Sequence, residues 1–589
     1  MRCNSLSGLT FFVVACVCGG IAQPPISAQT KPETKHNTKN VRYEITGVVV
    51  NSVGESPVTP CHITASPVST RGRGANRQFP ALANNADADE QGRFTITLPS
   101  AGSWRLTASA RGFVTQDYDE HQGFSSSVVL TSESPTLDLR FNLSPEAVIT
   151  GVVLDEAGEA VRGAQIALHS VPPPSPGGPQ PLGGTRAATQ TDDRGRYELT
   201  NVSPGGYRLT VQARPWYAAA LQQGAQFSGG ATALEPSLDM AYPVTWFPGT
   251  GDAALAETIV LHAGDAREAD FRLVPIPSIH LRIAPPPRSP NSGGDRLTPA
   301  FPMVQPVDPS GGGLSLTTRQ DGQGQFDIGG LTPGLYQVRL AMPNQESHST
   351  VVEVTANSAR TLDLSVSSRD MARVTIHFDG LAEASSGSEE GRNGALRVNL
   401  IDTDTQRGSF SSQGDIGSFI NTGRRGQRNP DTDSVMEVPP GRYEVVLQGR
   451  PNVFLTGLSA TGSDTSGRYV MLSAGESTLT VHVASGRASL SGIATLGGKP
   501  VIGAMVLLVP ITIEEPDSIR FLRQDQTNTD GSFDIASVIP GQYILIAIDH
   551  GWQINWGDRS TLRRYLTHGV PVELKSAAIM KQNVDAQVP

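Results

Sequence analysis

The sequence predicts an all-β protein, built as a tandem array of about five β-sandwiches of roughly 100 residues each. Three observations support this prediction. A short phrase recurs along the 589 residues, which indicates one supersecondary unit used repeatedly. Within the phrase, apolar and polar residues alternate with the period of two that strands show and helices do not. The 62 glycines and 43 prolines also make the chain rich in turns.

The recurring phrase predicts two strands and the turns that bound them. Its first glycine permits the positive φ of a turn, and an aromatic residue two places later opens a strand. A Pro-Gly pair, such as Pro540-Gly541, suits the two central positions of a type II turn, after which the second strand begins at once. The four copies are GRFTITLPSAGSWRL from Gly92, GRYELTNVSPGGYRL from Gly195, GQFDIGGLTPGLYQV from Gly324 and GSFDIASVIPGQYIL from Gly531.

Further strands open and close each unit. Opening strands are YEITGVVV from Tyr43, AVITGVVL from Ala147 and ASLSGIATL from Ala488, and closing strands are LDLRFNL from Leu137, ADFRLV from Ala269, LDLSV from Leu362 and LTVHVA from Leu479. Residues 543–548 are apolar in every position, which predicts a strand buried on both faces. The third and fourth units lack the glycine signature in their opening strands.

These strands predict the following domain plan. A signal peptide covers 1–28, a linker covers 29–40, and the sandwiches cover 41–144, 145–275, 276–368, 369–486 and 487–589. The second sandwich carries long loop insertions and the fourth a polar insertion.

The motifs resemble those of a known family. The order is an opening G-x-[VI]-x-D-x-x-G-x-P-[VL]-x-G-A, then D-x-x-G-x-[FY], then P-G-x-Y. This order is similar to that of the carboxypeptidase regulatory-like domain, a transthyretin-like, or prealbumin-like, β-sandwich related to the B-type repeats of collagen adhesins. The resemblance implies the fold and says little about function, because a sandwich is a scaffold for many tasks. Units two and five match best, through Gly151, Asp155, Gly158, Gly163 and Ala164 and through Gly492, Gly498, Pro500, Gly503 and Ala504.

The N-terminus predicts export. Arg2 precedes an apolar run over 9–17, and small residues offer cleavage after Ala22 or Ala28, as in a secretory signal. Val13-Val14-Ala15-Cys16 also resembles a bacterial lipobox, in which Cys16 would carry lipid; the alternative is a cysteine in a discarded signal. We expect a periplasmic, extracellular or outer-membrane-associated protein that meets a membrane only through such an anchor.

The sequence lacks two common motifs of hydrolytic enzymes. There is no H-E-x-x-H and no G-x-S-x-G, so we expect no catalytic residue, no metal and no cofactor. The net charge of −10 argues against nucleic acid as a partner. Asp87 to Gly92 begins like a calcium loop, but Leu98 stands where a bidentate glutamate is required, so these acids are expected to hold a turn.

Aromatic residues that follow strands are the candidate binding residues. Indole and phenol rings offer large rigid faces on which sugar rings stack. The competing interpretation is that these rings cap the sandwiches or fill interfaces between them. The candidates are Trp216, Tyr217, Trp246, Trp552 and Trp556, with Tyr242 and Phe247 in similar positions.

Three functions are compatible with these features. The first is a non-catalytic array, exported and used as a surface or extracellular scaffold for interactions. The second is a carbohydrate-binding protein that uses the loop aromatics. The third is an accessory module of an outer-membrane or peptidase system. The corresponding partners are a polysaccharide or an envelope protein.

Overall fold

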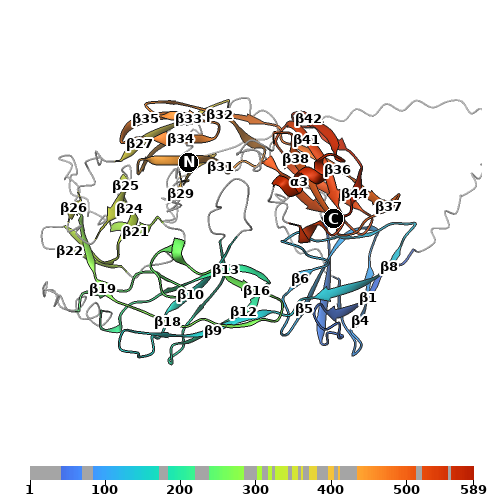
Figure 1. The fold of residues 1–589 in the computed structure, drawn as a ribbon, viewed down its shortest axis with the longest axis horizontal. Helices are drawn as coiled ribbons and strands as arrows, with labels where there is room; N and C mark the ends of the chain where they lie inside the picture. The colour runs from blue at the N-terminus through green and yellow to red at the C-terminus, as the bar shows by residue number, and fades with distance from the viewer. Residues whose placement is uncertain are drawn as a thin grey trace, which may run out of the picture. The chain divides into compact units, whose positions relative to one another are not determined.

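The computed structural model of the chain describes a series of strand-rich segments, which Figure 1 shows in chain order from blue to red. Residues Arg42–Pro589 form one compact unit. The described residues are 41–68, 84–171, 184–218, 238–283, 301–307, 316–320, 325–341, 348–355, 360–362, 371–380, 396–403, 409–411, 434–512, 521–554 and 559–589. Cys16, Trp556 and the proposed signal peptide lie outside them.

The first two groups of strands each form two sheets around one core. The first group has one sheet of β4 (Arg93–Leu98), β1 (Tyr43–Asn51) and β8 (Thr136–Leu143), and another of β3 (Asn84–Asp87), β2 (Cys61–Pro67), β5 (Gly102–Ala110), β6 (Gln116–Asp117) and β7 (Val128–Leu130). The second has β12 (Arg196–Val202), β9 (Ala147–Leu154), β17 (Ala266–Glu268) and β18 (Phe271–Arg272), facing β11 (Thr185–Gln190), β10 (Gln165–Ser170), β13 (Gly205–Gln212), β15 (Thr245–Trp246) and β16 (Ile259–Leu261).

The third and fourth groups repeat this plan. The third has β22 (Thr317–Gln320), β23 (Phe326–Leu331), β20 (Ile279–Ile283) and β26 (Arg360–Leu362), with β21 (Phe301–Pro306), β24 (Gly334–Ala341) and β25 (His348–Val354). The fourth has β30 (Ser434–Val438), β27 (Ala372–Asp379), β35 (Gly475–Ser485) and β32 (Val453–Thr461), with β29 (Ser409–Ser411), β28 (Arg397–Asp402), β31 (Gly441–Gln448), β34 (Tyr469–Leu472) and β33 (Asp464–Ser466). Within the second group, η1 (Ala253–Leu255) lies between β15 and β16, and a separate pair of short strands consists of β14 (Met240–Ala241) and β19 (Ile276–Pro277).

The fifth group adds a helix to the plan. Its strands are β36 (Ala488–Leu496), β37 (Lys499–Pro500), β38 (Met505–Pro510), β39 (Arg523–Gln526), β40 (Ser532–Val538), β41 (Gly541–Ile548), β42 (Val570–Leu574), β43 (Ile579–Lys581) and β44 (Val584–Gln587). The turn η4 (Gly551–Gln553) and the helix α3 (Arg559–Leu566) supply apolar side chains to a second cluster that includes Ile546 and Ile548 of β41. This cover buries β41 on both faces, as the sequence predicts.

One topology recurs in all five groups. The opening strand pairs antiparallel with the strand of the recurring phrase, as β9 does with β12, and parallel with the closing strand, as β9 does with β17 and β18. The corresponding opening strands β1, β20, β27 and β36 have the same two kinds of neighbour. The chain is therefore an all-β array of β-sandwiches.

The two strands of the recurring phrase pair with different neighbours. β4 pairs with β1 and β5 with β2, in different sheets, whereas β40 pairs with β36 and β41 with β38, in one nine-stranded sheet that β44 joins. The turn expected at Pro540-Gly541 therefore leads from a strand paired with β36 to a strand paired with β38. A type II turn requires positive φ at its glycine, and Gly541 is not among the glycines with positive φ. That detail of the prediction is wrong, whereas the positive φ expected at Gly92, Gly195 and Gly531 is confirmed.

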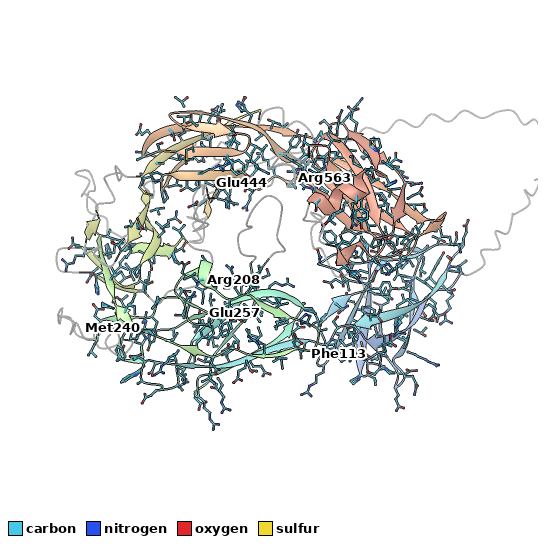
Figure 2. The ribbon with its side chains drawn as sticks, viewed as in Figure 1. Phe113, Arg208, Met240, Glu257, Glu444 and Arg563 are labelled. Atoms are coloured by element: carbon cyan, nitrogen blue, oxygen red, sulfur yellow. The ribbon has the colours of Figure 1, made fainter. Side chains whose placement is uncertain are left out.

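The sandwich cores consist of the alternating residues that the sequence marks. The aromatic residues that open the phrase strands, Phe94, Tyr197, Phe326 and Phe533, are all buried. A buried glutamate interrupts the apolar pattern in the fourth sandwich: Glu444 of β31, labelled in Figure 2, forms an ion pair at 3.3 Å with the partly buried Arg468. No helix of the described residues has the length and apolar character needed to cross a membrane.

Candidate functional site

Glu156 is at the centre of a polar and aromatic cluster on the second sandwich. It follows β9 in a turn that Asp155 holds, because the Asp155 carboxylate accepts hydrogen bonds from the backbone N–H groups of Ala157 (2.9 Å) and Glu159 (2.8 Å). Aspartate commonly organises a turn in this way. Asp155 is buried, so the adjacent Glu156 side chain extends from the surface of the sandwich at a fixed position.

Two tyrosines donate hydrogen bonds to the Glu156 carboxylate. The Tyr217 hydroxyl donates to Oε1 (3.1 Å) and the Tyr242 hydroxyl to Oε2 (2.7 Å). Tyr217 follows β13, whereas Tyr242 follows β14 and its ring is buried in the core of the second sandwich. The carboxylate therefore connects two segments that are far apart in sequence. An ionised carboxylate offers about four lone-pair positions, and the two tyrosines and the Glu156 backbone N–H occupy about three of them, so about one remains for a ligand.

The hydrogen bonds change the pKa values of all three groups. Burial by itself raises the pKa of Glu156, but the hydrogen bonds from Tyr242, from its own backbone and from Tyr217 hold that pKa below its ordinary value. Burial, together with the hydrogen bond to Glu156 and its negative charge, raises the pKa of Tyr217 to about 12. The same causes raise the pKa of Tyr242. Near neutral pH the cluster therefore holds one carboxylate and two neutral phenols.

Trp216 places an exposed aromatic face beside this cluster. Its side chain is 69% exposed, and its ring lies 5.7 Å from that of Tyr217 in an edge-to-face arrangement. A large ring left in water is unusual for a residue of this size. The combination of an indole face, a carboxylate and phenol hydroxyls suits a ligand with an apolar face and hydroxyl groups at its edge.

The other predicted aromatics occupy different environments. Trp246 is 2% exposed and packs 5.5 Å from the His169 ring. Trp552 is 8% exposed, donates its indole N–H to the Gly503 carbonyl oxygen (2.9 Å) and is stacked by His121 and Phe124. Burial leaves neither ring with an exposed face for a soluble ligand. These positions agree with the competing interpretation, in which the rings cap the sandwiches or fill interfaces between them.

Of the predicted set, only Trp216 and Tyr217 lie together at an accessible position among the described residues. Glu156 is the residue that the sequence analysis missed. A glutamate in an Asp-Glu-Ala-Gly turn has the pattern of an ordinary solvated loop, and its partners lie about 60 and 86 residues away. Only the fold reveals the cluster.

The turn acids have the structural role that the sequence predicts. Asp89 accepts hydrogen bonds from the backbone N–H groups of Gln91 (2.9 Å) and Arg93 (2.8 Å). Asp192 does the same for Arg194 (2.9 Å) and Arg196 (2.8 Å). Within the described segments, no group of three or more His, Cys, Asp or Glu residues is placed to hold a metal ion.

Solved structures that resemble the chain at low similarity include a Bacillus anthracis protein and bacterial pilins. The Bacillus anthracis TIE protein is 10% identical with a TM-score of 0.13, covering 94% of this chain and 76% of that one. A streptococcal ancillary pilin is 12% identical with a TM-score of 0.19, covering 54% and 97%. The minor pilin GBS52 of Streptococcus agalactiae is 10% identical with a TM-score of 0.20, covering 42% and 99%. Scores this low say nothing about the partners of this chain.

The comparison with protein families gives a more specific result. No curated protein matches the chain. A family model, the carboxypeptidase regulatory-like domain, matches residues 148–274. That stretch begins in β9, contains the Glu156 turn and ends just after β18. The resemblance drawn from the opening and phrase motifs is thus confirmed for the second sandwich, which is similar to the carboxypeptidase regulatory-like domain.

Proposed function

We propose that the chain is an exported, non-catalytic array of β-sandwiches that serves as a scaffold for interactions outside the cytoplasm. The observation that supports this is the repetition of one sandwich topology, with a buried core in each of the five groups. Units that each bury their own core give a chain whose length is set by their number. Such an array needs no bound group to keep its form.

Export is tested through the mature N-terminus. The full chain, expressed with its own first 28 residues in a bacterial host, should leave the cytoplasm and yield a mass that corresponds to cleavage after Ala22 or Ala28. A mass that includes lipid on Cys16 would assign the anchored form of the same proposal. Recovery of the uncleaved chain from the cytoplasm alone would contradict export.

The scaffold role is tested by cross-linking in cells. Cross-linking of the exported chain should recover the same envelope protein in repeated experiments, and deletion of residues 276–368 should alter that adduct while the remaining sandwiches stay folded. A matched exported protein of similar charge is the control. Adducts no more frequent than those of the control would contradict the scaffold role.

Trp216 and the adjacent Glu156 cluster support a second function, binding of a polysaccharide. A pyranose ring stacked on Trp216 would bring its hydroxyl groups within reach of the Glu156 carboxylate, which retains a lone pair. Retention on a panel of polysaccharides tests this, with Trp216→Ala expected to weaken binding about 5- to 10-fold, the loss of roughly 1 kcal/mol of stacking. The control is Leu255→Ala, which removes an exposed apolar side chain from the same sandwich. No retention of the unaltered chain on any polymer would contradict this function.

A further inference from the structure

Three polar residues of the fourth sandwich form a hydrogen-bonded row across neighbouring strands. Asp379 of β27 and His482 of β35 stand opposite each other, and their side chains meet at 2.8 Å between Oδ2 and Nδ1. The other ring nitrogen, Nε2, lies 2.9 Å from Oγ of Ser459 on β32. All three side chains lie on the outward face of the sheet, with Asp379 and Ser459 exposed and His482 partly exposed.

The direction of the hydrogen bonds follows from the chemistry of the groups. An ionised carboxylate only accepts, so Asp379 holds the imidazole proton at Nδ1 and leaves Nε2 as an acceptor. The Ser459 hydroxyl then donates to Nε2. This is the order in which a carboxylate orients an imidazole and the imidazole activates a serine hydroxyl as a nucleophile.

The backbone holds this row in place. Gly380 follows β27 with φ of +88°, and any Cβ there would overlap the Val483 carbonyl oxygen, so the chain beside Asp379 is closely packed on β35. On β32, the pairing shifts between Leu455 and Gly457, a bulge that sets the position of Ser459 relative to His482. Gly457 stands opposite His482 without a side chain, which leaves the imidazole edge open to an approaching molecule.

We propose that Ser459 is an acyl acceptor, activated by His482 and oriented through Asp379, that takes an acyl group from a carboxylic ester. Ser459 Oγ forms a bond to the ester carbonyl carbon while the bond from that carbon to the leaving alcohol oxygen breaks. The serine proton passes to His482 Nε2 and then to the leaving alkoxide. The products are an acyl-serine and an alcohol, so no oxidant or second substrate is required.

The surroundings of the row set its expected reactivity. It lies on an open sheet face, where β27 and β35 have a neighbour on each side, whereas β32, which carries Ser459, is the edge strand and pairs with β35. The gain expected here is that of the general base, typically about 100-fold or somewhat more. A single acylation, rather than rapid turnover, fits this arrangement and is compatible with a scaffold.

The test uses the full chain with two probes, a fluorophosphonate and an aryl acetate. Mass mapping should find Ser459 modified by both, about 100-fold faster than Ser466, an exposed serine of the same sandwich. Ser459→Ala should remove the modification, and Ser466→Ala should leave it unchanged. His482→Gln should slow it by about the same 100-fold factor without altering thermal unfolding. Modification of Ser459 no faster than that of Ser466, or unaffected by His482→Gln, would overturn the proposal.

Asp379 is a positioning residue, and its role is separated from simple folding by combining substitutions. Asp379→Asn should slow acylation by about 10-fold or more, because the imidazole proton is no longer held at Nδ1. Added to His482→Gln, it should cause no further loss, since residues that act as one unit are not additive. An independent, multiplicative effect of Asp379→Asn would show that it acts through folding alone and would overturn this part of the proposal.

Discussion

At the scale of the residue, the opening strands contain a glycine because another part of the chain occupies the space of its side chain. A Cβ built on Gly151 would overlap the Ala269 carbonyl oxygen and lie 2.8 Å from Cε1 of Tyr197. Gly492 stands in the same relation to the Gln582 carbonyl oxygen and to Phe533. The glycine of the opening motif thus lets the closing strand and the phrase aromatic approach the opening strand from two sides.

This packing gives a prediction for Gly151→Ala. Its φ is not in the left-handed region, so backbone strain is not the cause of any effect. The added methyl group must instead displace backbone, and overpacking of this kind costs about 1–3 kcal/mol. We expect calorimetry of the full chain to show one transition lowered by several degrees. Gly184→Ala, which adds a methyl group with nothing within 4 Å, should leave every transition unchanged. Equal effects of the two substitutions would contradict the packing argument.

The Glu156 cluster gives a prediction about ionisation. The pKa of Tyr217 is raised to about 12, first by burial and then by the hydrogen bond and charge of Glu156. Glu156→Gln keeps an acceptor and removes the charge, so we expect the pKa of Tyr217 to fall toward the ordinary value of about 10. Ultraviolet absorbance of tyrosinate across a pH titration, with Tyr217→Phe to identify the transition, measures this change. An unchanged titration in Glu156→Gln would show that Glu156 does not act on Tyr217.

The sequence could indicate which residues are buried within strands but not which loop aromatics are exposed. The alternation that marks Phe94 or Phe533 as core is local, and it needs no knowledge of the partner strand. Trp216 and Trp552 both follow a strand, and nothing local distinguishes them. Trp552 is buried because His121 and Phe124, from the first sandwich, stack on its ring. Long-range packing of that kind has no signature in a single sequence.

At the scale of the element, the second strand of the recurring phrase is fixed at its start by a tyrosine. The hydroxyl of this tyrosine donates to the carbonyl oxygen four residues earlier, on the far side of the connection between the two phrase strands. The four cases are Tyr207 to Ser203 (2.7 Å), Tyr336 to Thr332 (2.8 Å), Tyr443 to Pro439 (2.7 Å) and Tyr543 to Ile539 (2.6 Å). In the first sandwich Trp104 takes this place, and its indole nitrogen is buried with no partner among the described residues.

Loss of this hydrogen bond should destabilise a single sandwich. Tyr543→Phe keeps the buried ring and removes only the hydroxyl, which leaves the Ile539 carbonyl without that donor. We expect a cost of about 1 kcal/mol, seen as a lowered transition for the fifth sandwich in calorimetry of the full chain. Faster amide exchange over 532–548 should accompany it, with exchange in the first sandwich as the internal control. Unchanged exchange there would mean that the connection is held by its apolar contacts alone.

The connection between the two strands of the recurring phrase also shows the limit of predicting strand pairing from sequence. The period of two identifies the faces of β4 and β5, and Ala101-Gly102, which stands in place of the Pro-Gly pair, marks their junction. Neither property identifies the strand with which each will pair, because pairing depends on the opening and second strands many residues earlier. The helix α3 had no place in the sequence prediction for a related reason. It is short, and its role is to cover one sheet of the fifth sandwich.

At the scale of the whole molecule, residues of the first and fifth sandwiches share a buried hydrogen-bond network. Gln526 donates from Nε2 to Oγ of Ser126 (2.9 Å) and to Oδ2 of Asp119 (3.1 Å). Ser126 donates to the Thr527 carbonyl oxygen (2.8 Å), and Gln526 and Ser126 are almost fully buried. A backbone bond from Thr529 N–H to the Ser127 carbonyl oxygen (3.0 Å) extends the contact. Two sandwiches of the array that are far apart in sequence can therefore be linked by hydrogen bonds, although each has its own core.

The network predicts a contact that depends on Gln526 and on pH. Gln526→Ala removes the buried amide that donates to Ser126 and Asp119, at a cost of about 1–3 kcal/mol, so amides over 126–129 and 526–529 should exchange roughly 10- to 100-fold faster. Gln542→Ala, an exposed position of the same sandwich, is the control.

Burial raises the pKa of Asp119, although His121, Ser126 and His550 oppose the shift. The contact therefore binds protonated Asp119 more strongly, and it should weaken as pH rises through that raised pKa. Asp119→Asn should remove this pH dependence of amide exchange. If Gln526→Ala leaves amide exchange unchanged at every pH, the network does not hold the two sandwiches together in solution.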